Sequence, residues 1–169
     1  GKATPDFQGG LTNNLKWKGF DMSFQFNFSV GSKIYGNHLR YDEQIGNSFA
    51  SPYTKYVEEN RWRKPGDNAK VPMLMFTSGV TENSHSSRFL MDGSYLKFRS
   101  FSLGYTLPSN VVSKLGLSRS RVFFNAENIY TFSDSEYRGF DPASVGANGV
   151  QWWNYPTPRS FVFGLTLGF

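Results

Sequence analysis

The sequence contains no cysteine, so disulfide bonds, thiolate metal sites and thiol nucleophiles are excluded. Histidine is scarce as well: the chain carries His38 and His85, and neither belongs to an H-E-x-x-H motif. The G-x-S-x-G and P-loop spacings are also missing. We therefore expect no enzyme, no metal site and no cofactor, and we expect both histidines to be solvated loop side chains.

The acidic residues give no recognisable site either. Asp134, Glu136 and Asp141 lack the ligand order and the distal Glu of a calcium-binding loop. Glu58 and Glu59 have no second carboxylate constellation near them, so a surface pair is a better interpretation than the catalytic pair of a glycosidase. We expect these groups to be ordinary loop side chains.

No run of five or more like charges occurs, although the formal net charge is +5. Dispersed basic residues give little support for nucleic-acid binding, so we expect no nucleic acid among the partners. An anionic substrate or lipopolysaccharide near the loops is compatible with the sign of the charge.

No apolar stretch reaches the 18 or more residues of a membrane helix. The mean hydropathy of -0.46 resembles that of an ordinary polar protein. A transmembrane barrel has the same weak signal, because its strands alternate apolar and polar residues. The 17 Phe, 9 Tyr and 4 Trp are more informative, since aromatic residues favour strands and concentrate at membrane interfaces.

A clean alternation is present at the carboxyl end of the sequence. Every second residue there is apolar: Phe161, Phe163, Leu165, Leu167 and Phe169. Successive side chains of a strand point to opposite faces, so these five would share one face, and small or polar residues would share the other. An outer-membrane barrel turns such a face toward lipid. The terminal Phe169 is similar to the assembly signal of Gram-negative outer-membrane proteins.

The segment 20–30 repeats the pattern, with the length of roughly 9–11 residues that a tilted strand needs to cross a bilayer. The two segments together predict a lipid-facing set: Phe20, Met22, Phe24, Phe26, Phe28, Phe161, Phe163, Leu165 and Leu167. A soluble sandwich remains an alternative, and it requires Phe24, Phe26 and Phe163 to be buried against a second sheet.

Weaker alternation predicts three more strands, over 8–18, 94–106 and 119–132. The apolar register changes between Lys97 and Ser100, which predicts a bulge. A tight hairpin is expected at Lys18-Gly19.

Between the strands, Ser109 to Leu115 is expected to form a helical turn, with Ser109 as its cap and Gly116 ending it. The segment 31–93 shows no sustained alternation, and its length indicates a functional loop. The segment 133–158 forms the second long connection.

The parity of five antiparallel strands places both long connections at one end of the sheet. If the carboxyl terminus is periplasmic, the connections 31–93 and 133–158 and residues 1–7 are extracellular, as in outer-membrane barrels. Five strands do not close a barrel, whose single-chain bacterial examples have at least eight. We therefore expect residues 1–169 to be an all-β segment of a larger antiparallel transmembrane barrel, with the earlier strands absent.

Short motifs along nearly the whole chain support this interpretation. They are Thr4-Pro5-Asp6-Phe7, Gly9-Gly10-Leu11, Lys18-Gly19-Phe20-Asp21-Met22-Ser23, Asn60-Arg61-Trp62, Asp92-Gly93-Ser94-Tyr95-Leu96-Lys97, Ser102-Leu103-Gly104-Tyr105-Thr106-Leu107-Pro108, Asn125-Ala126-Glu127-Asn128-Ile129-Tyr130-Thr131-Phe132, Gly139-Phe140-Asp141-Pro142, and Tyr155-Pro156-Thr157-Pro158-Arg159-Ser160-Phe161. Each is weak alone, but the ordered series resembles the carboxy-terminal part of the SusC/RagA family of TonB-dependent (TonB-linked) outer-membrane transporters.

The resemblance implies a 22-stranded barrel in the Gram-negative outer membrane, of which this chain supplies the last strands. It implies a nutrient importer for oligosaccharides or peptides whose mouth is covered by a SusD-like surface lipoprotein. It also implies an amino-terminal plug pulled by TonB, and the given sequence contains neither plug nor TonB-contact segment. The remaining implied partners are the rest of the barrel, lipid and the outer-membrane assembly machinery.

Aromatic residues of the two long connections are the candidate ligand-binding residues. They are Trp62 beside Arg61 in the first, and Trp152, Trp153 and Tyr155 in the second. Flat apolar faces beside hydrogen-bond donors bind sugar rings or peptide side chains. The same residues could instead form an interfacial belt, pack the loops together or contact the lid protein. The segment 139–142 is expected to be a turn that shapes its loop.

A further alternative is another outer-membrane barrel, such as an adhesin or an autotransporter translocator. Such a protein would show the same alternation and the same terminal Phe. A plug domain in the complete protein would separate this alternative from the importer.

Overall fold

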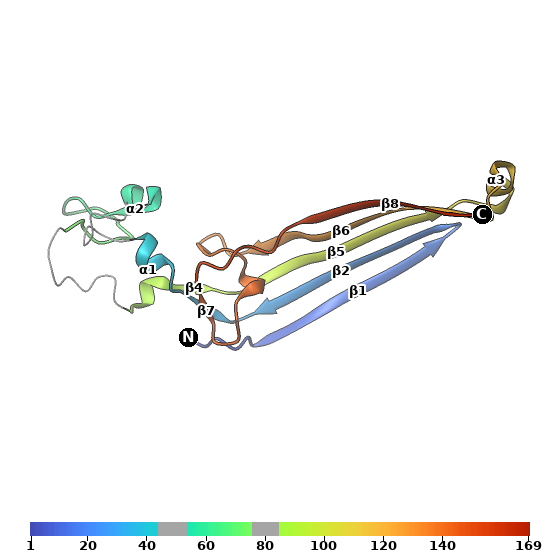
Figure 1. Cartoon of the computed structure of the whole chain (residues 1–169). Coiled ribbons are helices and arrows are strands. Elements are labelled where there is room, and N and C mark those ends of the chain that lie inside the picture. Colours follow the sequence, from blue (N-terminus) through green and yellow to red (C-terminus); the bar gives the residue numbers. More distant parts are fainter. Residues whose placement is uncertain (44–53, 76–84) are drawn as a thin grey trace.

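A computed structural model describes residues 1–43, 54–75 and 85–169. Its main element is an antiparallel sheet of five strands in the order β1-β2-β5-β6-β8 (Figure 1). The strands are β1 (Phe7–Trp17), β2 (Phe20–Val30), β5 (Tyr95–Thr106), β6 (Arg119–Ser133) and β8 (Ser160–Gly168). All five predicted strands are confirmed, close to their predicted bounds.

The strand register gathers the alternating apolar residues on one face. Phe24 lies opposite Phe101, and Phe124 lies opposite Phe163, so these rings share a face across four strands. Their contacts are close, with ring centroids 4.6 Å apart for Phe124 and Phe163. We name this the apolar face; its residues are Phe7, Leu11, Leu15, Trp17, Phe20, Met22, Phe24, Phe26, Phe28, Leu96, Phe98, Phe101, Leu103, Tyr105, Val122, Phe124, Ala126, Tyr130, Phe132, Phe161, Phe163, Leu165 and Leu167.

The opposite face of the sheet is mostly polar. We name it the polar face; it carries Gln8, Thr12, Asn14, Lys16, Asp21, Ser23, Gln25, Asn27, Ser29, Lys97, Ser100, Ser102, Thr106, Arg119, Arg121, Asn125, Glu127, Thr131, Ser160 and Thr166. One aromatic ring on this face, that of Phe123, lies against Gly164, where an added Cβ would come within 2.1 Å of the ring. The pairing explains why an apolar residue interrupts the polar side of β6, since the ring covers a bare stretch of backbone.

A bulge keeps the apolar face in phase along the strands. Phe98 and Phe101 are an odd number of residues apart, so strict alternation would place them on opposite faces. The register shifts between Phe98 and Ser100, and Arg99 is the extra residue. On the neighbouring strand Asn128 adopts a positive φ of 53° at the same level. The bulge predicted between Lys97 and Ser100 is confirmed.

The two short connections lie together at one end of the sheet. Lys18 and Gly19 both have positive φ, 43° and 89°, as a type I′ hairpin turn requires. The other connection forms the helix α3 (Ser109–Val112) and a 3₁₀ turn (Ser113–Leu115), and Gly116 ends it at φ 69°. The predicted cap was placed wrongly, because the N-cap position falls on the extended Pro108 and not on Ser109.

The two long connections meet at the other end, which we name the loop end (Figure 1). They form a second sheet, in the order β4-β3-β7, from β3 (Lys33–Gly36), β4 (Leu90–Asp92) and β7 (Val150–Gln151). The loop end also contains the helices α1 (Leu39–Asp42) and α2 (Lys55–Asn60) and 3₁₀ turns at Ser87–Phe89 and Pro142–Ser144. The sequence predicted none of these elements, because runs of two to six residues are too short to show a period.

The loop end has a small core of its own. Ile34, Leu39, Phe89 and Met91 are buried against one another, and Tyr35, Tyr137 and Val145 pack around them. Because these residues come from β3, β4 and both long connections, the core fixes the two loops as one unit.

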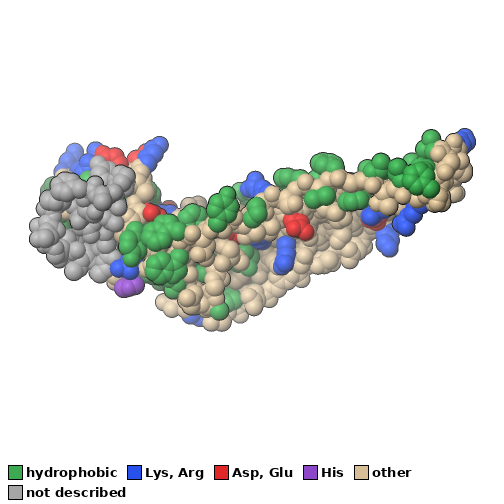
Figure 2. All heavy atoms as spheres, viewed as in Figure 1, with side chains coloured by type: hydrophobic (Ala, Val, Ile, Leu, Met, Phe, Trp, Pro, Cys, Tyr) green, Lys and Arg blue, Asp and Glu red, His purple; other side chains and the backbone are tan. Residues whose placement is uncertain are grey.

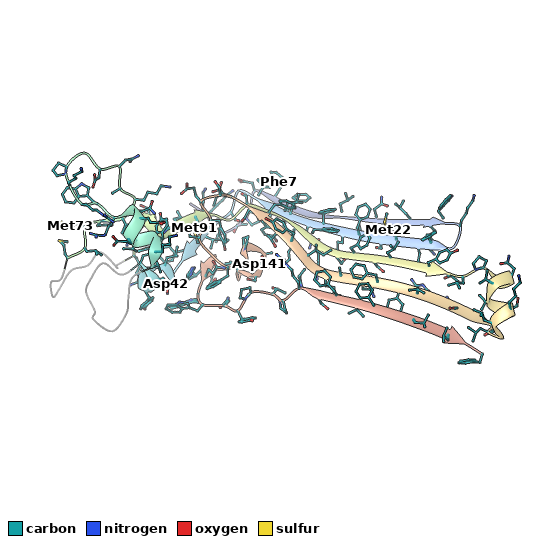
Figure 3. All side chains as sticks on the ribbon, turned by 90° about the horizontal axis from the view of Figure 1, so that it is seen from above. Phe7, Met22, Asp42, Met73, Met91 and Asp141 are labelled. Carbon is teal, nitrogen blue, oxygen red and sulfur yellow. The ribbon has the colours of Figure 1, made fainter. Side chains whose placement is uncertain are left out.

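Nothing in the described residues covers the apolar face. Phe163 is 80% exposed, and Phe24 and Phe26 are half-buried by their neighbours in the same sheet. Figure 3 shows the same single layer, with Phe7 at the loop end and Met22 farther along. The sandwich alternative requires a second sheet over these residues, and the arrangement contradicts it. No helix in the described ranges is long and apolar enough to span a membrane.

Candidate functional site

An aromatic cluster lies at the loop end, where the two long connections touch. The rings of Trp153 and Tyr41 are 5.1 Å apart, and those of Trp152 and Trp153 are 6.3 Å apart. The indole Nε1 of Trp153 donates a hydrogen bond to Asp42 Oδ1 at 3.3 Å, which orients the ring. Both indoles remain about half exposed, at 48% and 51%. The cluster thus offers flat apolar surface beside a carboxylate.

Not all predicted ligand-binding residues join this cluster. Tyr155 is 90% exposed and extends from the same loop. Trp62 follows α2, and its backbone N donates to Val71 O at 2.9 Å. In residues 1–43, 54–75 and 85–169, Trp62 makes no ring contact with Trp152 or Trp153. The five candidates therefore occupy two separate places.

The guanidinium of Arg61 forms an ion pair with a carboxylate three residues earlier in the chain. Its Nε donates to Glu58 Oε2 at 3.0 Å, and Arg63 Nη2 donates to the other carboxylate oxygen at 2.6 Å. Glu58 therefore holds two arginines of the segment that follows α2. This supports the surface interpretation of the Glu58-Glu59 pair.

Buried polar contacts hold the second long connection beneath the aromatic cluster. The fully buried Gln151 accepts hydrogen bonds at Oε1 from the Tyr137 hydroxyl, at 2.9 Å, and from Phe140 N, at 3.3 Å. Gly139 makes the approach possible, since a Cβ there would lie 1.9 Å from Gln151 Oε1. Burial raises the pKa of the Tyr137 hydroxyl well above its usual range.

An ion pair ties this connection to the main sheet. Lys97 Nζ on the polar face donates to Asp141 Oδ2 at 2.7 Å, and both side chains are 11% exposed. The other carboxylate oxygen accepts from Ala143 N at 3.0 Å and so caps the following 3₁₀ turn. Figure 3 shows Asp141 where the strands reach the loop end. The segment 139–142 is the turn expected from the sequence.

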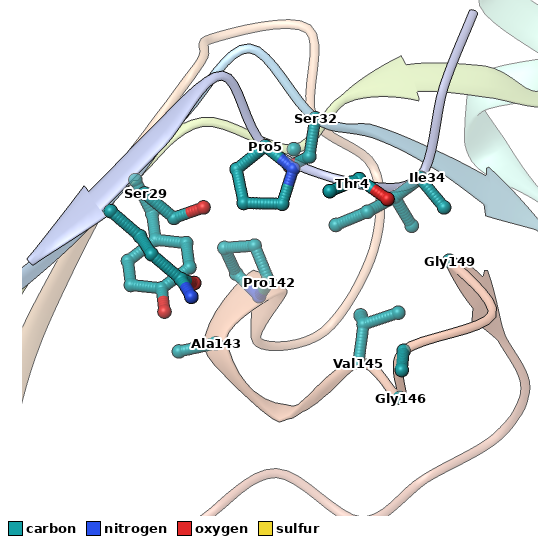
Figure 4. Close-up of a pocket in the computed structure, with 15 residues that line it drawn as sticks. Thr4, Pro5, Ser29, Ser32, Ile34, Pro142, Ala143, Val145, Gly146 and Gly149 are labelled. Carbon is teal, nitrogen blue, oxygen red and sulfur yellow. The ribbon is translucent and has the colours of Figure 1, made fainter.

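A cavity of about 280 Å³ lies where the polar face meets the loop end. Uncharged residues line it, among them Thr4, Pro5, Ser29, Ile34 and Val145 (Figure 4). Figure 4 shows these side chains converging from the amino-terminal segment, β2, β3 and the 142–149 loop. A cavity of this lining suits a neutral group, and no sequence signal indicated it, because its walls come from four separate segments.

The described residues offer no metal site. No group of three His, Asp or Glu side chains in them is placed to hold a metal ion. Glu136 of the acidic cluster instead pairs with Lys70 at 2.8 Å, which lowers its pKa and raises that of the lysine. The expectation for His38 was wrong, because it is 2% exposed, with Nδ1 3.3 Å from Gln151 O.

No family model matches the chain. It is 34% identical to TonB-dependent receptor P3 of Formosa agariphila, over 100% of this chain and 17% of the relative. It is 24% identical to TonB-dependent receptor SusC of Bacteroides thetaiotaomicron, over 99% of this chain and 16% of the relative. A solved structure of the RagAB peptide importer in the closed-closed state matches with a TM-score of 0.78 and 27% identity, over 99% of this chain and 18% of that one. The chain thus spans less than a fifth of these relatives.

Proposed function

The chain belongs to the SusC/RagA family of TonB-dependent receptors, and from this premise we propose that it forms the carboxy-terminal wall of an outer-membrane nutrient importer. In this role it is no enzyme. It supplies strands, and two extracellular loops, to a larger transmembrane barrel in a Gram-negative bacterium. The plug and the remaining strands belong to the rest of that protein.

The observation that carries the proposal is the register of the sheet. Five strands bring their apolar residues to one face, and that face has no protein cover in the described residues. The eleven residues of β2 span about 36 Å, or about 28 Å at a tilt of ~40°, which matches an apolar band of ~25 Å. An apolar patch of this extent in water marks a site of association with lipid or protein.

The proposal assigns the two faces to different surroundings. The apolar face, including Phe20, Met22, Phe24, Phe26 and Phe28 of β2, contacts lipid, and the polar face lines the lumen. Phe161, Phe163, Leu165 and Leu167 continue the lipid-facing set on β8, and Phe169 acts as the assembly signal. The unpaired edges of β1 and β8 join the remaining strands of the barrel.

Residues 1–169 contain no cysteine, so the two faces can be tested directly in a full-length receptor from which any cysteine outside this range has been removed. In the full-length receptor, single fluorophore-labelled variants Phe24→Cys and Phe163→Cys would be reconstituted into vesicles with spin-labelled lipid. Lipid quenching should be strong at both. The matched controls Gln25→Cys and Thr166→Cys lie on the polar face and should be quenched weakly. Equal quenching on the two faces would contradict the transmembrane assignment.

We further infer that the loop end takes up an oligosaccharide or a peptide together with a SusD-like lipoprotein lid. The half-exposed Trp152 and Trp153 and the uncharged cavity where the polar face meets the loop end support this inference. Tyr155, Trp62 and Arg61 remain candidates for substrate or lid contact. The similarity to RagAB, a peptide importer by its title, and to SusC supports the same class.

Titration of candidate glycans and peptides into the full-length receptor tests this inference. Trp153→Ala should weaken binding, because it removes one aromatic face and its hydrogen bond to Asp42. Trp17→Ala, on the apolar face at the opposite end of the sheet, serves as the control. Unchanged affinity for the Trp153 variant would remove the cluster from the binding site.

The other outer-membrane barrels remain the alternative. An adhesin or translocator would have the same alternation. The similarity to TonB-dependent receptors over the whole chain favours the importer.

A further inference from the structure

The connection between β5 and β6 exposes two aliphatic side chains, Val111 and Leu115. Leu115 is 64% exposed and Val111 is also exposed, whereas Val112 between them is buried. These residues belong to α3 and to the 3₁₀ turn that follows it, and we name residues 109–115 the α3 turn. Lys114 is exposed on the same turn.

The spacing of these residues gives the α3 turn distinct sides. Val111 and Leu115 are four residues apart, so they share one side of the turn. Val112 is the buried side, and α3 contacts β6. The exposed Ser113 lies two residues beyond Val111, or ~200° around a helix, on the flank opposite to Val111 and Leu115.

The α3 turn lies on the side of the sheet that carries the apolar face. Ser120 of β6 is in the register of that face, opposite Leu167, but it is only 5% exposed. Val122, the next residue of the same face, is 50% exposed, so the cover over Ser120 is confined to the strand end. Figure 1 shows α3 rising from this end of the sheet. Figure 2 shows hydrophobic side chains along one edge of the sheet and onto this end, opposite the Lys and Arg side chains.

The neighbouring short connection carries a tryptophan and a lysine at the same end. Thr106 N donates to Gly19 O at 2.8 Å, so the two short connections lie side by side. Trp17 ends β1 on the apolar face and is largely exposed, and Lys18 Nζ lies 5.1 Å from its ring centroid. In residues 1–43, 54–75 and 85–169, neither Lys18 nor Lys114 forms an ion pair. Two ammonium groups thus accompany the exposed apolar side chains at this end.

Lipid is the partner that fits this arrangement. The boundary between acyl chains and headgroups holds apolar side chains beside tryptophan, and lysine stems extend there so that their ammonium groups reach the lipid phosphates. Val111 and Leu115 continue the apolar face, so the layer that covers that face extends to them. A stable protein interface needs ~800 Å² from each partner, and two aliphatic side chains present much less.

We propose that the α3 turn is an interfacial anchor of the barrel wall. Val111 and Leu115 enter the periplasmic leaflet of the outer membrane, and Lys114 and Lys18 bind the phosphates of anionic phospholipids. The proposal rests on the proposed function, because lipid must cover the apolar face. It adds a connection to the lipid-contacting strands, and this connection fixes the depth at which β5 and β6 end.

The accessibility of nitroxide labels tests the insertion in the full-length receptor, freed of other cysteines and reconstituted into vesicles. Oxygen concentrates in lipid and a nickel chelate in water, so their relative collision rates report the surroundings of each label. We expect the label at Leu115→Cys to lie in lipid and that at the matched control Ser113→Cys to lie in water. Equal ratios at these two positions, with the Phe24→Cys label still in lipid, would overturn the anchor alone. A Phe24→Cys label in water would overturn the transmembrane proposal instead.

A second measurement tests the binding of phosphates by the lysines. A fluorophore at Leu115→Cys should be quenched more by spin-labelled phosphatidylglycerol than by spin-labelled phosphatidylcholine. Lys114→Gln should lower this preference by up to about fivefold, the contribution of one basic residue near an anionic surface, and adding Lys18→Gln should lower it further. The matched control Lys16→Gln removes a lysine of the polar face and should leave the preference unchanged. An unchanged preference in the double variant would overturn the binding of anionic phospholipid.

Discussion

Removing either member of the Lys97 and Asp141 pair should release the second long connection from the sheet. Both side chains are 11% exposed, so a single substitution leaves the other charge buried without its partner. Losses of about 3–5 kcal/mol are typical of such a change. Asp141→Asn is the cleaner variant, because its amide oxygen can still accept from Ala143 N and keep the cap.

The amide of Phe140 reports the effect directly. It donates to Gln151 Oε1 and so exchanges with solvent only when the connection opens. A loss of about 3–5 kcal/mol should speed its hydrogen exchange in the full-length receptor by about two to three and a half powers of ten, at ~1.4 kcal/mol per power of ten. The Val122 amide on β6, near the short connections of the main sheet, is the control and should not change.

A double-mutant cycle decides whether the charges themselves are coupled. Lys97→Met combined with Asp141→Asn removes both charges and should cost much less than the sum of the two single losses. Additive losses would refute the reasoning, because they would mean that neither charge depends on the other.

Three further predictions concern the faces, the turn and the loop sheet. Phe163→Arg should destabilise the inserted receptor by about 2–4 kcal/mol in a vesicle folding assay, and Thr166→Arg on the polar face should cost much less. Gly139→Ala should speed proteolysis of the loop end, because its Cβ would lie 1.9 Å from Gln151 Oε1, and unchanged proteolysis would contradict the close approach. The ion pair with Lys33 lowers the pKa of Asp92 to about 2, so its stabilisation is present above the unfolded pKa of ~3.9 and is lost as the pH falls through 2. Because both groups are over one-third exposed, we expect only about 0.5–1 kcal/mol between pH 5 and 2, measured by exchange of the Ser94 amide, with Asp92→Asn giving a flat profile.

The main sheet could be read from the sequence because its strands are long and one side of each is apolar. Apolar and polar residues alternate over the eleven residues 20–30, a period that fits a strand and not a helix. The parity of five antiparallel strands then places both long connections at one end of the sheet. Even the bulge was visible, as the change of register between Lys97 and Ser100.

The loop end was not predictable by the same means. β7 has two residues and β3 has four, so neither shows a period. The contacts that fix the site also join distant residues: Lys97 and Asp141 are 44 positions apart, and Trp153 and Asp42 are 111 apart. A single sequence carries no signal for such pairs, because their spacing depends on the fold.

The separate core of Ile34, Leu39, Phe89 and Met91 has an evolutionary consequence. Since the loop end has a core of its own, we expect substitutions on its surface to leave the pairing of the main strands intact. If the loop end binds substrate as proposed, its specificity can change in evolution while the five-stranded sheet is retained. A new substrate then requires substitutions only in the two long connections at one end of the sheet.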